Sequence, residues 1–543
     1  MPMKSHALVL GILAAVALPL FFLTPFTREL WLPDEPRYAE IAMEMTETGN
    51  WLIPHLHGEV YTEKPPFYFW ILAGSAKVFG HWGPVAMITP AALSAVACIG
   101  VIYLLGALLF TRPIGLLSSL MLMTSILFVG VGQMVRMDML LLLCISLALL
   151  CFYRLYAKTT PYDGWYVAGF FLAAALGTLT KGPIGLGLPG LIILIFLVWT
   201  RDFRVLKLTW IAWGSLLYLG IVLTWLGLAL REGGWEYVYH ITIMQNLGRV
   251  YDSFSHARPW YFYLHTVPWI TLPWFPFFVG ALIAGRGTPK VVQQGHALRF
   301  LWIWWGTTFL FFSCVSGKLE IYLLPLFPPT AMLSAQFWWT SIGARRTEGK
   351  LSRGLTIPAY ILGGSLLLAS IIVILRGEIG TYSSGIIFLE VIGALIIYAA
   401  ISQSPRFLLG LVWSITPIMV FYGMFTAVPM LNRQLSLQSV LTDFEQLKTT
   451  EATLALWEFY YPIDYYVPSH VPVLTTPEQK RVFFSSKTPV YCLAREKYLD
   501  AIRQEVNRPL YVLGTYRIQR KRFVLVSQFP GNSEGHAGVL SMR

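Results

Sequence analysis

The first polar passage after the apolar opening run is Leu32-Pro33-Asp34-Glu35-Pro36-Arg37-Tyr38-Ala39-Glu40. Glu35 is placed to cap a helix that Pro36 starts, because proline is tolerated at the first helical position and a carboxylate suits the positive end of the helix dipole. Apolar residues then follow at helical spacing: Tyr38, Ile41, Ala42 and Met45. We interpret the segment as a helix on a membrane surface with a carboxylate pair at its start; a charged, capped surface helix is the alternative.

The composition indicates a polytopic membrane protein. Of the 543 residues, 56% are hydrophobic and 13% are charged, and the mean hydropathy is +0.60. Apolar runs repeatedly reach the roughly 20 residues that a bilayer requires. The net charge of +12 lies in short loop clusters rather than on one domain. This distribution favours membrane orientation over nucleic-acid binding, and we expect no nucleic acid partner.

The apolar runs predict about thirteen spanning helices. Their approximate bounds are 7–26, 84–110, 114–132, 138–157, 165–180, 183–200, 209–229, 261–284, 300–316, 320–341, 355–376, 383–402 and 406–426. No small-residue cleavage site follows the first run, so we interpret it as a retained signal anchor. The clear charge inside a span is Glu390, for which a packing or protonated carboxyl is favoured over a functional one.

The distribution of lysine and arginine tests this topology, because short cytoplasmic loops should be the basic ones. With the N-terminus inside, the inner loops hold Arg112, Arg154, Lys158, Arg201, Arg204, Lys207, Arg286, Lys290, Arg299, Arg345, Arg346, Lys350, Arg353 and Arg406. An odd number of spans then places three long segments together on the outer face. These are the first loop, residues 27–83, a second loop at 230–260, and the C-terminal tail.

The tail, residues 430–543, lacks long apolar runs and alternates helix-like stretches with short β-rich ones. We therefore predict two domains: a transmembrane domain over 1–429, with surface helices in the 27–83 loop, and a small extracytoplasmic α/β domain over 430–543. The five cysteines show no metal-ligand spacing, and we expect no disulfide framework.

Isolated charges gather on the predicted outer face. Lys64 follows Glu63 in the first loop and places an ammonium where an anionic headgroup would lie, although snorkelling is an alternative. Asp138 and Lys181 occupy outer helix ends. Three cations and a tyrosine add to this face: Arg249, Arg258, Lys318 and Tyr322. Arg258 lies in a tryptophan- and tyrosine-rich patch typical of the interfacial aromatic belt.

These residues resemble the polyprenyl-phosphate-sugar glycosyltransferases of the GT-C superfamily, most closely the 4-amino-4-deoxy-L-arabinose lipid A transferases. The motifs that carry the resemblance are Pro33-Asp34-Glu35-Pro36-Arg37-Tyr38-Ala39-Glu40, Glu63-Lys64-Pro65, Thr180-Lys181-Gly182 and Tyr322-Leu323-Leu324-Pro325. The resemblance covers the membrane part well and the tail in outline. The second proline of Pro65-Pro66 departs from the closest members.

The resemblance implies roles for individual residues. Asp34 becomes the catalytic carboxylate, with Asp138 and Lys181 at further catalytic positions. By the resemblance, four residues gather around the lipid phosphate: Tyr61, Lys64, Arg249 and Tyr322. We also expect Glu35, Arg37, Arg258 and Lys318 to bind substrate. The implied partners are an undecaprenyl phosphate sugar donor, lipid A or another extracytoplasmic acceptor, and membrane lipids, with the enzyme a monomer in the bacterial inner membrane and its site on the periplasmic side.

The chemistry of such a donor agrees with these residues. The anomeric bond breaks as the sugar becomes cation-like, and fixed lysine, arginine and tyrosine donors stabilise the departing phosphate, so we expect no cofactor and no metal. Asp34 acts as a general base toward a hydroxyl acceptor, giving inversion by single displacement. A lipid A phosphate is already an anionic nucleophile, and Asp34 would then orient the acceptor or hold an amino group of the sugar.

Two other functions are weighed against this one. A protein hydroxyl or another glycan as the acceptor would leave the same donor chemistry in place. A lipid or sugar transporter would favour broken helices and midplane charges in paired halves, whereas here the charges gather at one face.

Overall fold

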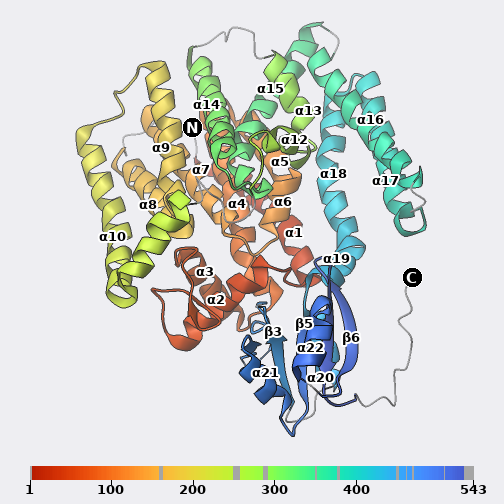
Figure 1. Ribbon diagram of the computed structural model, residues 1–543. Helices are drawn as coiled ribbons and strands as arrows, with labels where there is room; N and C mark the ends of the chain where they lie inside the picture. The colour runs from red at the N-terminus through yellow and green to blue at the C-terminus, as the bar shows by residue number, and fades with distance from the viewer. Residues whose placement is uncertain are drawn as a thin grey trace.

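The computed structural model describes residues 3–157, 163–248, 257–284, 292–348, 351–375, 379–447, 452–459, 461–467, 470–506 and 508–530. It consists of a large bundle of helices with a small sheet at one end (Figure 1). The helices of the first loop, residues 27–83, lie between the bundle and the sheet. This loop therefore contacts both.

The bundle follows the predicted apolar segments. Its helices are α1 (Met3–Phe22), α4 (Pro84–Leu109), α5 (Arg112–Met123), α6 (Ile126–Gly132), α7 (Met137–Tyr156), α8 (Asp163–Lys181), α9 (Ile184–Thr200), α10 (Leu208–Tyr239), α12 (Phe262–Ile270), α13 (Phe275–Ala284), α14 (Val292–Cys314), α15 (Phe327–Glu348), α16 (Arg353–Leu375), α17 (Ile379–Ile401) and α18 (Pro405–Phe425). Each predicted segment overlaps one of these helices or a bent pair of them, and the 320–341 segment begins with a 3-10 helix, Glu320–Leu326, before α15. Among the described residues, 8 helices are long and apolar enough to cross a membrane, or up to 10 if each bent pair is one span.

The two bent pairs meet inside the bundle. The chain turns by 68° between α5 and α6 and by 112° between α12 and α13. The backbone N–H of Ile126 donates to the carbonyl of Leu272 at 2.9 Å. The Trp274 indole donates to the Thr124 hydroxyl at 3.0 Å, and the Thr416 hydroxyl of α18 donates to the Thr124 carbonyl at 2.5 Å. Backbone groups freed at the breaks are thereby satisfied in an apolar surrounding, as a bilayer requires.

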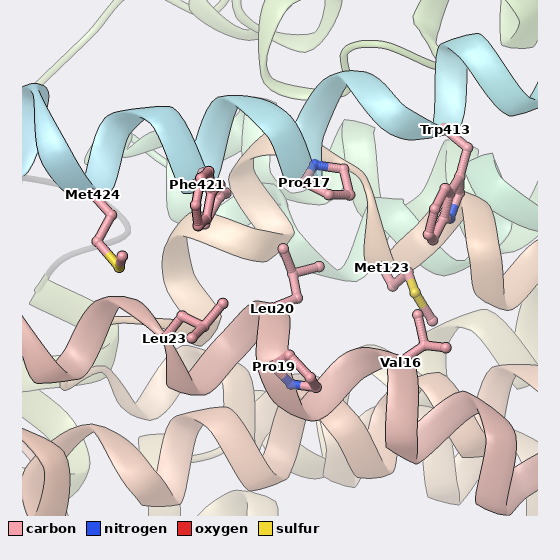
Figure 2. Close-up of a pocket in the computed structure, with 10 residues that line it drawn as sticks. Val16, Pro19, Leu20, Leu23, Met123, Trp413, Pro417, Phe421 and Met424 are labelled. Carbon is pink, nitrogen blue, oxygen red and sulfur yellow. The ribbon is translucent and has the colours of Figure 1, made fainter.

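An apolar cavity of about 230 Å³ lies where α18 passes α1. Figure 2 shows Pro19 and Leu20 of α1 facing Pro417 and Phe421 of α18 across it, with Met123 at the end of α5 beside them. The lining is apolar except for the Trp413 indole N–H, and it includes no charged side chain to act on a sugar phosphate.

The first loop contains α2 (Asp34–Thr48), the hairpin of β1 (His55–Leu56) and β2 (Glu59–Val60), and α3 (Phe67–Phe79). The predicted apolar stripe of α2 is buried, and it packs on Tyr68 and Phe69 of α3. One detail of the prediction is wrong: α2 begins at Asp34, not at Pro36, and Glu35 lies within its first turn instead of capping it.

The tail forms a five-stranded mixed sheet with strand order β4-β3-β5-β7-β6. Its elements are α19 (Ala427–Leu435), α20 (Gln438–Leu447), β3 (Thr453–Trp457), β4 (Val473–Leu474), α21 (Pro477–Phe484), β5 (Val490–Arg495), α22 (Leu499–Val506), β6 (Tyr511–Ile518) and β7 (Lys521–Ser527). β3 pairs parallel with β4 and β5, and the remaining pairs are antiparallel. An α/β tail is therefore confirmed, and the division at residue 430 stays a prediction.

Three segments predicted to share the outer face lie together at one end of the bundle (Figure 1). The Leu32 N–H donates to the Leu435 carbonyl at 2.8 Å, which joins the first loop to the tail. The Trp225 indole of α10 donates to the Leu52 carbonyl at 3.2 Å. Tyr237, in the last turn of α10, belongs to the same apolar cluster as Ile53. The start of the 230–260 loop therefore packs on the first loop.

Candidate active site

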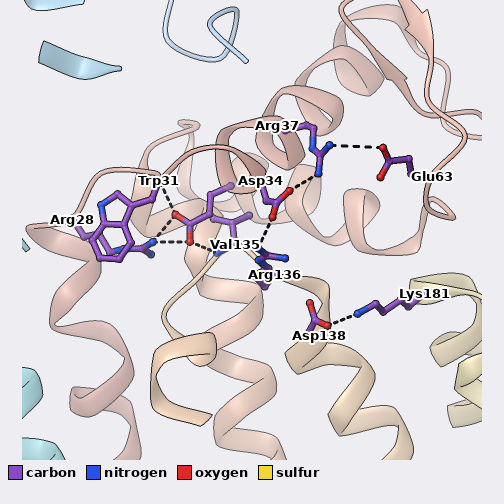
Figure 3. A network of polar contacts seen from close by, with 10 residues as sticks. Arg28, Trp31, Asp34, Arg37, Glu63, Val135, Arg136, Asp138 and Lys181 are labelled. Atoms are coloured by element: carbon purple, nitrogen blue, oxygen red, sulfur yellow. Dashed lines mark hydrogen bonds and ion pairs between the residues drawn. The ribbon is translucent and has the colours of Figure 1, made fainter. Parts of the chain in front are cut away.

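Asp34 lies at the centre of a group of charges at the start of α2. Its carboxylate forms ion pairs with Arg37, one turn further along α2, and with Arg136, which immediately precedes α7 (Figure 3). Arg37 also approaches Glu63 of the first loop at 3.8 Å. All three side chains around Asp34 are partly exposed, so the group combines fixed charges with access from outside.

Arg136 is the member of this group to which the sequence analysis assigned no role. The available signal was an arginine at an outer helix end, where the bias toward inner loops makes a cation uncommon. Its partner Asp34 is 102 residues away in sequence. Only the fold brings them together.

Glu35 is buried, with 3% of its surface exposed, and its carboxylate pairs with Arg28. Arg28 donates to both of its carboxylate oxygens at 2.6 Å. The backbone N–H groups of Trp31 and Val135 donate to it at 2.7 Å and 3.2 Å (Figure 3). These partners hold Glu35 inside the helix start and give it an anchoring role. Its contact with substrate stays a prediction.

We expect Glu35→Ala to destabilise the protein by about 3–5 kcal/mol, because it leaves the buried Arg28 guanidinium without its partner. Glu47→Ala, on an exposed position of the same helix, is the matched control. Thermal unfolding of both variants in detergent measures the effect. Equal midpoints for the two variants would show that the Arg28 pair does not hold the loop.

Asp138 and Lys181 form an ion pair between α7 and α8. Asp138 is buried, and the Lys181 ammonium lies 4.6 Å from the centre of the Tyr322 ring. Three residues that the sequence predicted separately are therefore in contact. Figure 3 shows this pair beside the Asp34–Arg136 pair, and Arg136 precedes Asp138 by two residues.

Tyr61 and Lys64 come from the first loop. The Tyr61 hydroxyl is buried and has no hydrogen-bond partner among the described residues. Burial raises the pKa of Tyr61 well above its usual value, so the phenol stays protonated and available as a donor. Lys64 is half-buried, and its ammonium donates to the Glu63 carbonyl at 3.0 Å.

Lys318 and Arg258 lie where two backbone segments meet. The Lys318 ammonium, only 3% exposed as a residue, donates to the carbonyls of Arg258, at 3.3 Å, and of Val315. Burial lowers the pKa of Lys318 from its usual value. The Arg258 side chain is exposed and lies over the Phe262 ring. Lys318 thus ties the 315–319 turn to residue 258, and Arg249 lies outside the described residues.

At this end of the bundle, carboxylates hold three cationic side chains in place: Arg37, Arg136 and Lys181. Asp34 orients two guanidinium groups, and Asp138 orients one ammonium. A bound phosphate would find donors whose positions are already fixed, and such preorganised charges are the main source of stabilisation for a transition state that develops negative charge. The site therefore suits departure of a phosphate leaving group.

Parts of the chain are similar in sequence to known sugar transferases. The family model described as dolichyl-phosphate-mannose-protein mannosyltransferase matches residues 63–227. An undecaprenyl phosphate-alpha-4-amino-4-deoxy-L-arabinose arabinosyl transferase of Aeromonas hydrophila is 34% identical over 331 residues, which are 59% of each chain. A second such transferase, from Proteus mirabilis, is 32% identical over 345 residues, covering 60% of this chain and 59% of the relative. The chain thus spans about three fifths of the length of these curated relatives.

Among solved structures, ArnT from Cupriavidus metallidurans bound to undecaprenyl phosphate superposes with a TM-score of 0.76 and 22% identity, covering 96% of this chain and 98% of that one. Its apo state gives a TM-score of 0.74 with 21% identity over 96% and 97%. At this identity the likeness shows the fold. The chain accordingly has the fold of these ArnT structures, and in sequence it is similar to undecaprenyl phosphate-alpha-4-amino-4-deoxy-L-arabinose arabinosyl transferases.

Proposed function

We propose that this protein is an integral-membrane inverting glycosyltransferase that moves a sugar from undecaprenyl phosphate to lipid A on the periplasmic face of the inner membrane. The sugar is 4-amino-4-deoxy-L-arabinose or a related amino sugar. The observation that carries the proposal is the pair of fixed charge groups, Asp34 with Arg37 and Arg136, and Asp138 with Lys181, at one end of an ArnT fold.

In this proposal the cations stabilise the departing phosphate. The bond between the anomeric carbon and the phosphate oxygen breaks, and its electron pair stays on the phosphate. Lys64, Lys181 and Tyr61 supply donors to that phosphate, and each charge-assisted hydrogen bond is shorter and stronger than a neutral one. An acceptor oxygen forms the new bond on the opposite face of the sugar ring, which inverts the configuration.

Asp34 has two possible roles that depend on the acceptor. With a hydroxyl acceptor, it takes the proton as the new bond forms. With a lipid A phosphate, no proton need move, and Asp34 positions Arg37 and Arg136 or holds the ammonium of the amino sugar. Because both carboxylate oxygens already accept from guanidinium groups, the positioning role fits the geometry better.

A protein or glycan acceptor is the second candidate, favoured by the family model over residues 63–227, whose description names a protein mannosyltransferase. A transporter is less well supported, because the charged pairs lie at one end of the bundle.

Purified protein in nanodiscs tests the proposal, with undecaprenyl phosphate-linked aminoarabinose as donor and lipid A or a serine- and threonine-containing peptide as acceptor. Mass spectrometry should find the added sugar on lipid A alone. Glycosylated peptide with unmodified lipid A would replace the first candidate with the second. Consumption of the donor without any glycosylated product would exclude both candidate functions.

The proposed topology predicts that the first loop, the end of α10 and the tail are all periplasmic. In a cysteine-free background, cysteines at the exposed positions Glu59, Glu232 and Gln438 should react with a membrane-impermeant thiol reagent in intact cells. A cysteine at exposed Leu206, between α9 and α10, is the inner control and should react only after lysis. Protection of position 232 in intact cells would contradict the shared site.

A further inference from the structure

A second cluster of polar side chains lies where the tail meets the first loop, apart from the Asp34 group. His57 Nδ1 lies 3.1 Å from Asp464 Oδ2, and His470 Nδ1 lies 2.7 Å from the same oxygen. The two imidazole rings are 4.2 Å apart between centroids and inclined by 36°. One potential ligand atom from each residue lies within 4.8 Å of the other two.

The first loop presents His57 on a rigid turn. His57 and Gly58 join β1 to β2, and both have positive φ, at 59° and 76°. Two consecutive positive φ values are typical of the tight turn whose twist matches a β-hairpin. The Glu44 carboxylate of α2 accepts from the N–H groups of both residues. A residue other than glycine is uncommon in this conformation, and here the backbone is held so that the His57 imidazole contacts Asp464 of the tail.

The tail presents Asp464 in an equally fixed way. The Val471 N–H donates to Oδ1 at 2.9 Å, which leaves Oδ2 facing the two histidines. The next two residues secure the segment: Tyr465 donates to the Trp82 carbonyl at 2.6 Å and Tyr466 to the Leu30 carbonyl at 2.9 Å.

We propose that His57, Asp464 and His470 bind one zinc ion, which clamps the tail onto the first loop. Two imidazole nitrogens and one carboxylate oxygen form a ligand set that zinc prefers. In a tetrahedral site with Zn–N and Zn–O distances of about 2.0–2.1 Å, ligand atoms lie about 3.3 Å apart. The two nitrogen–oxygen separations here are 3.1 Å and 2.7 Å. The His470 side chain is 61% exposed, so the fourth position faces solvent and takes water.

This ion would have a structural role and does not depend on the proposed transfer reaction. Its ligands come from opposite ends of the chain, 407 residues apart for His57 and Asp464. A metal that binds only when both segments are docked shifts the equilibrium toward the docked form.

Zinc content tests the site directly. The full-length protein, purified in detergent without a histidine tag, is treated with EDTA, dialysed against zinc and then against metal-free buffer, and its zinc is measured by mass spectrometry. His57→Asn, which tolerates positive φ, Asp464→Asn and His470→Gln remove one ligand each. His55→Gln on the same hairpin is the control. Wild type and His55→Gln should hold one equivalent more than the other three variants; equal contents in all five proteins would overturn the site.

Proteolysis tests the clamp. Zinc at a hundredfold its Kd should slow cleavage within the tail of the wild type about a hundredfold when cleavage requires undocking, and should leave the rate in His470→Gln unchanged. Because His470 is exposed, this variant should fold even if Asp464→Asn does not. Zinc that binds the wild type without slowing cleavage would overturn the clamp.

Discussion

Asp34→Asn should abolish measurable sugar transfer while the protein still folds. The substitution keeps the size of the side chain and removes the charge that holds Arg37 and Arg136 in place. Removing one preorganised group of this kind costs about 3–4 kcal/mol of transition-state stabilisation, and here two guanidinium groups lose their position together. We therefore expect kcat/KM to fall by at least about a thousandfold.

Transfer to lipid A by purified wild type and variant measures this effect, with thermal unfolding to verify folding. Asp500→Asn, whose side chain is 90% exposed in the tail, is the matched control. Turnover close to that of the control would exclude Asp34 from the mechanism. Activity of Asp34→Asn that recovers with a phosphate acceptor but not with a hydroxyl acceptor would identify Asp34 as a base.

Lys181→Ala is expected to have the second largest effect, because it should lower both the activity and the stability of the protein. It removes a cation from beside Tyr322, and it leaves the buried Asp138 carboxylate without its ion pair. Breaking such a pair costs about 3–5 kcal/mol of stability. Loss of a charge-assisted contact to the donor phosphate would cost about 2–4 kcal/mol of transition-state stabilisation in addition.

The double variant Asp138→Asn/Lys181→Ala separates these two contributions. It removes both charges, so the unfolding midpoint should return most of the way to that of the wild type. If Lys181 also binds the donor phosphate, kcat/KM for the donor should remain at least thirtyfold low, equivalent to about 2 kcal/mol. Full recovery of both quantities would make Lys181 purely a partner of Asp138.

Hydropathy located the helices of the bundle because a run of about 20 apolar residues is a local property of the sequence. It did not predict that 114–132 and 261–284 are broken. The groups that make the breaks tolerable, Leu272 for Ile126 and Thr416 for Thr124, lie more than a hundred residues away. A local pattern cannot reveal a hydrogen bond whose two halves come from distant segments.

The same reason explains the outcome at the site. Asp34 and Lys64 were recognisable because their motifs are contiguous. The beginning of α2 was misplaced because Arg28 and the Val135 N–H, which fix Glu35 inside the first turn, act from outside the helix. The short strand β4 has no sequence signal of its own, because its two residues show no alternation and its pairing with β3 is parallel.

The contact between the beginning and the end of the chain sets the order in which this protein can mature. The Asn432 side chain accepts from the Glu29 N–H and the Trp31 indole and donates to the Thr27 carbonyl. A ribosome makes residues 27–31 some four hundred residues before it makes Asn432, and chains generally acquire structure from the N-terminus first. Residues 27–31 can therefore form their hydrogen bonds with Asn432 only after all the membrane helices have been synthesised. A polypeptide released early, even one with all its apolar helices, would carry a loop that has not reached its final form.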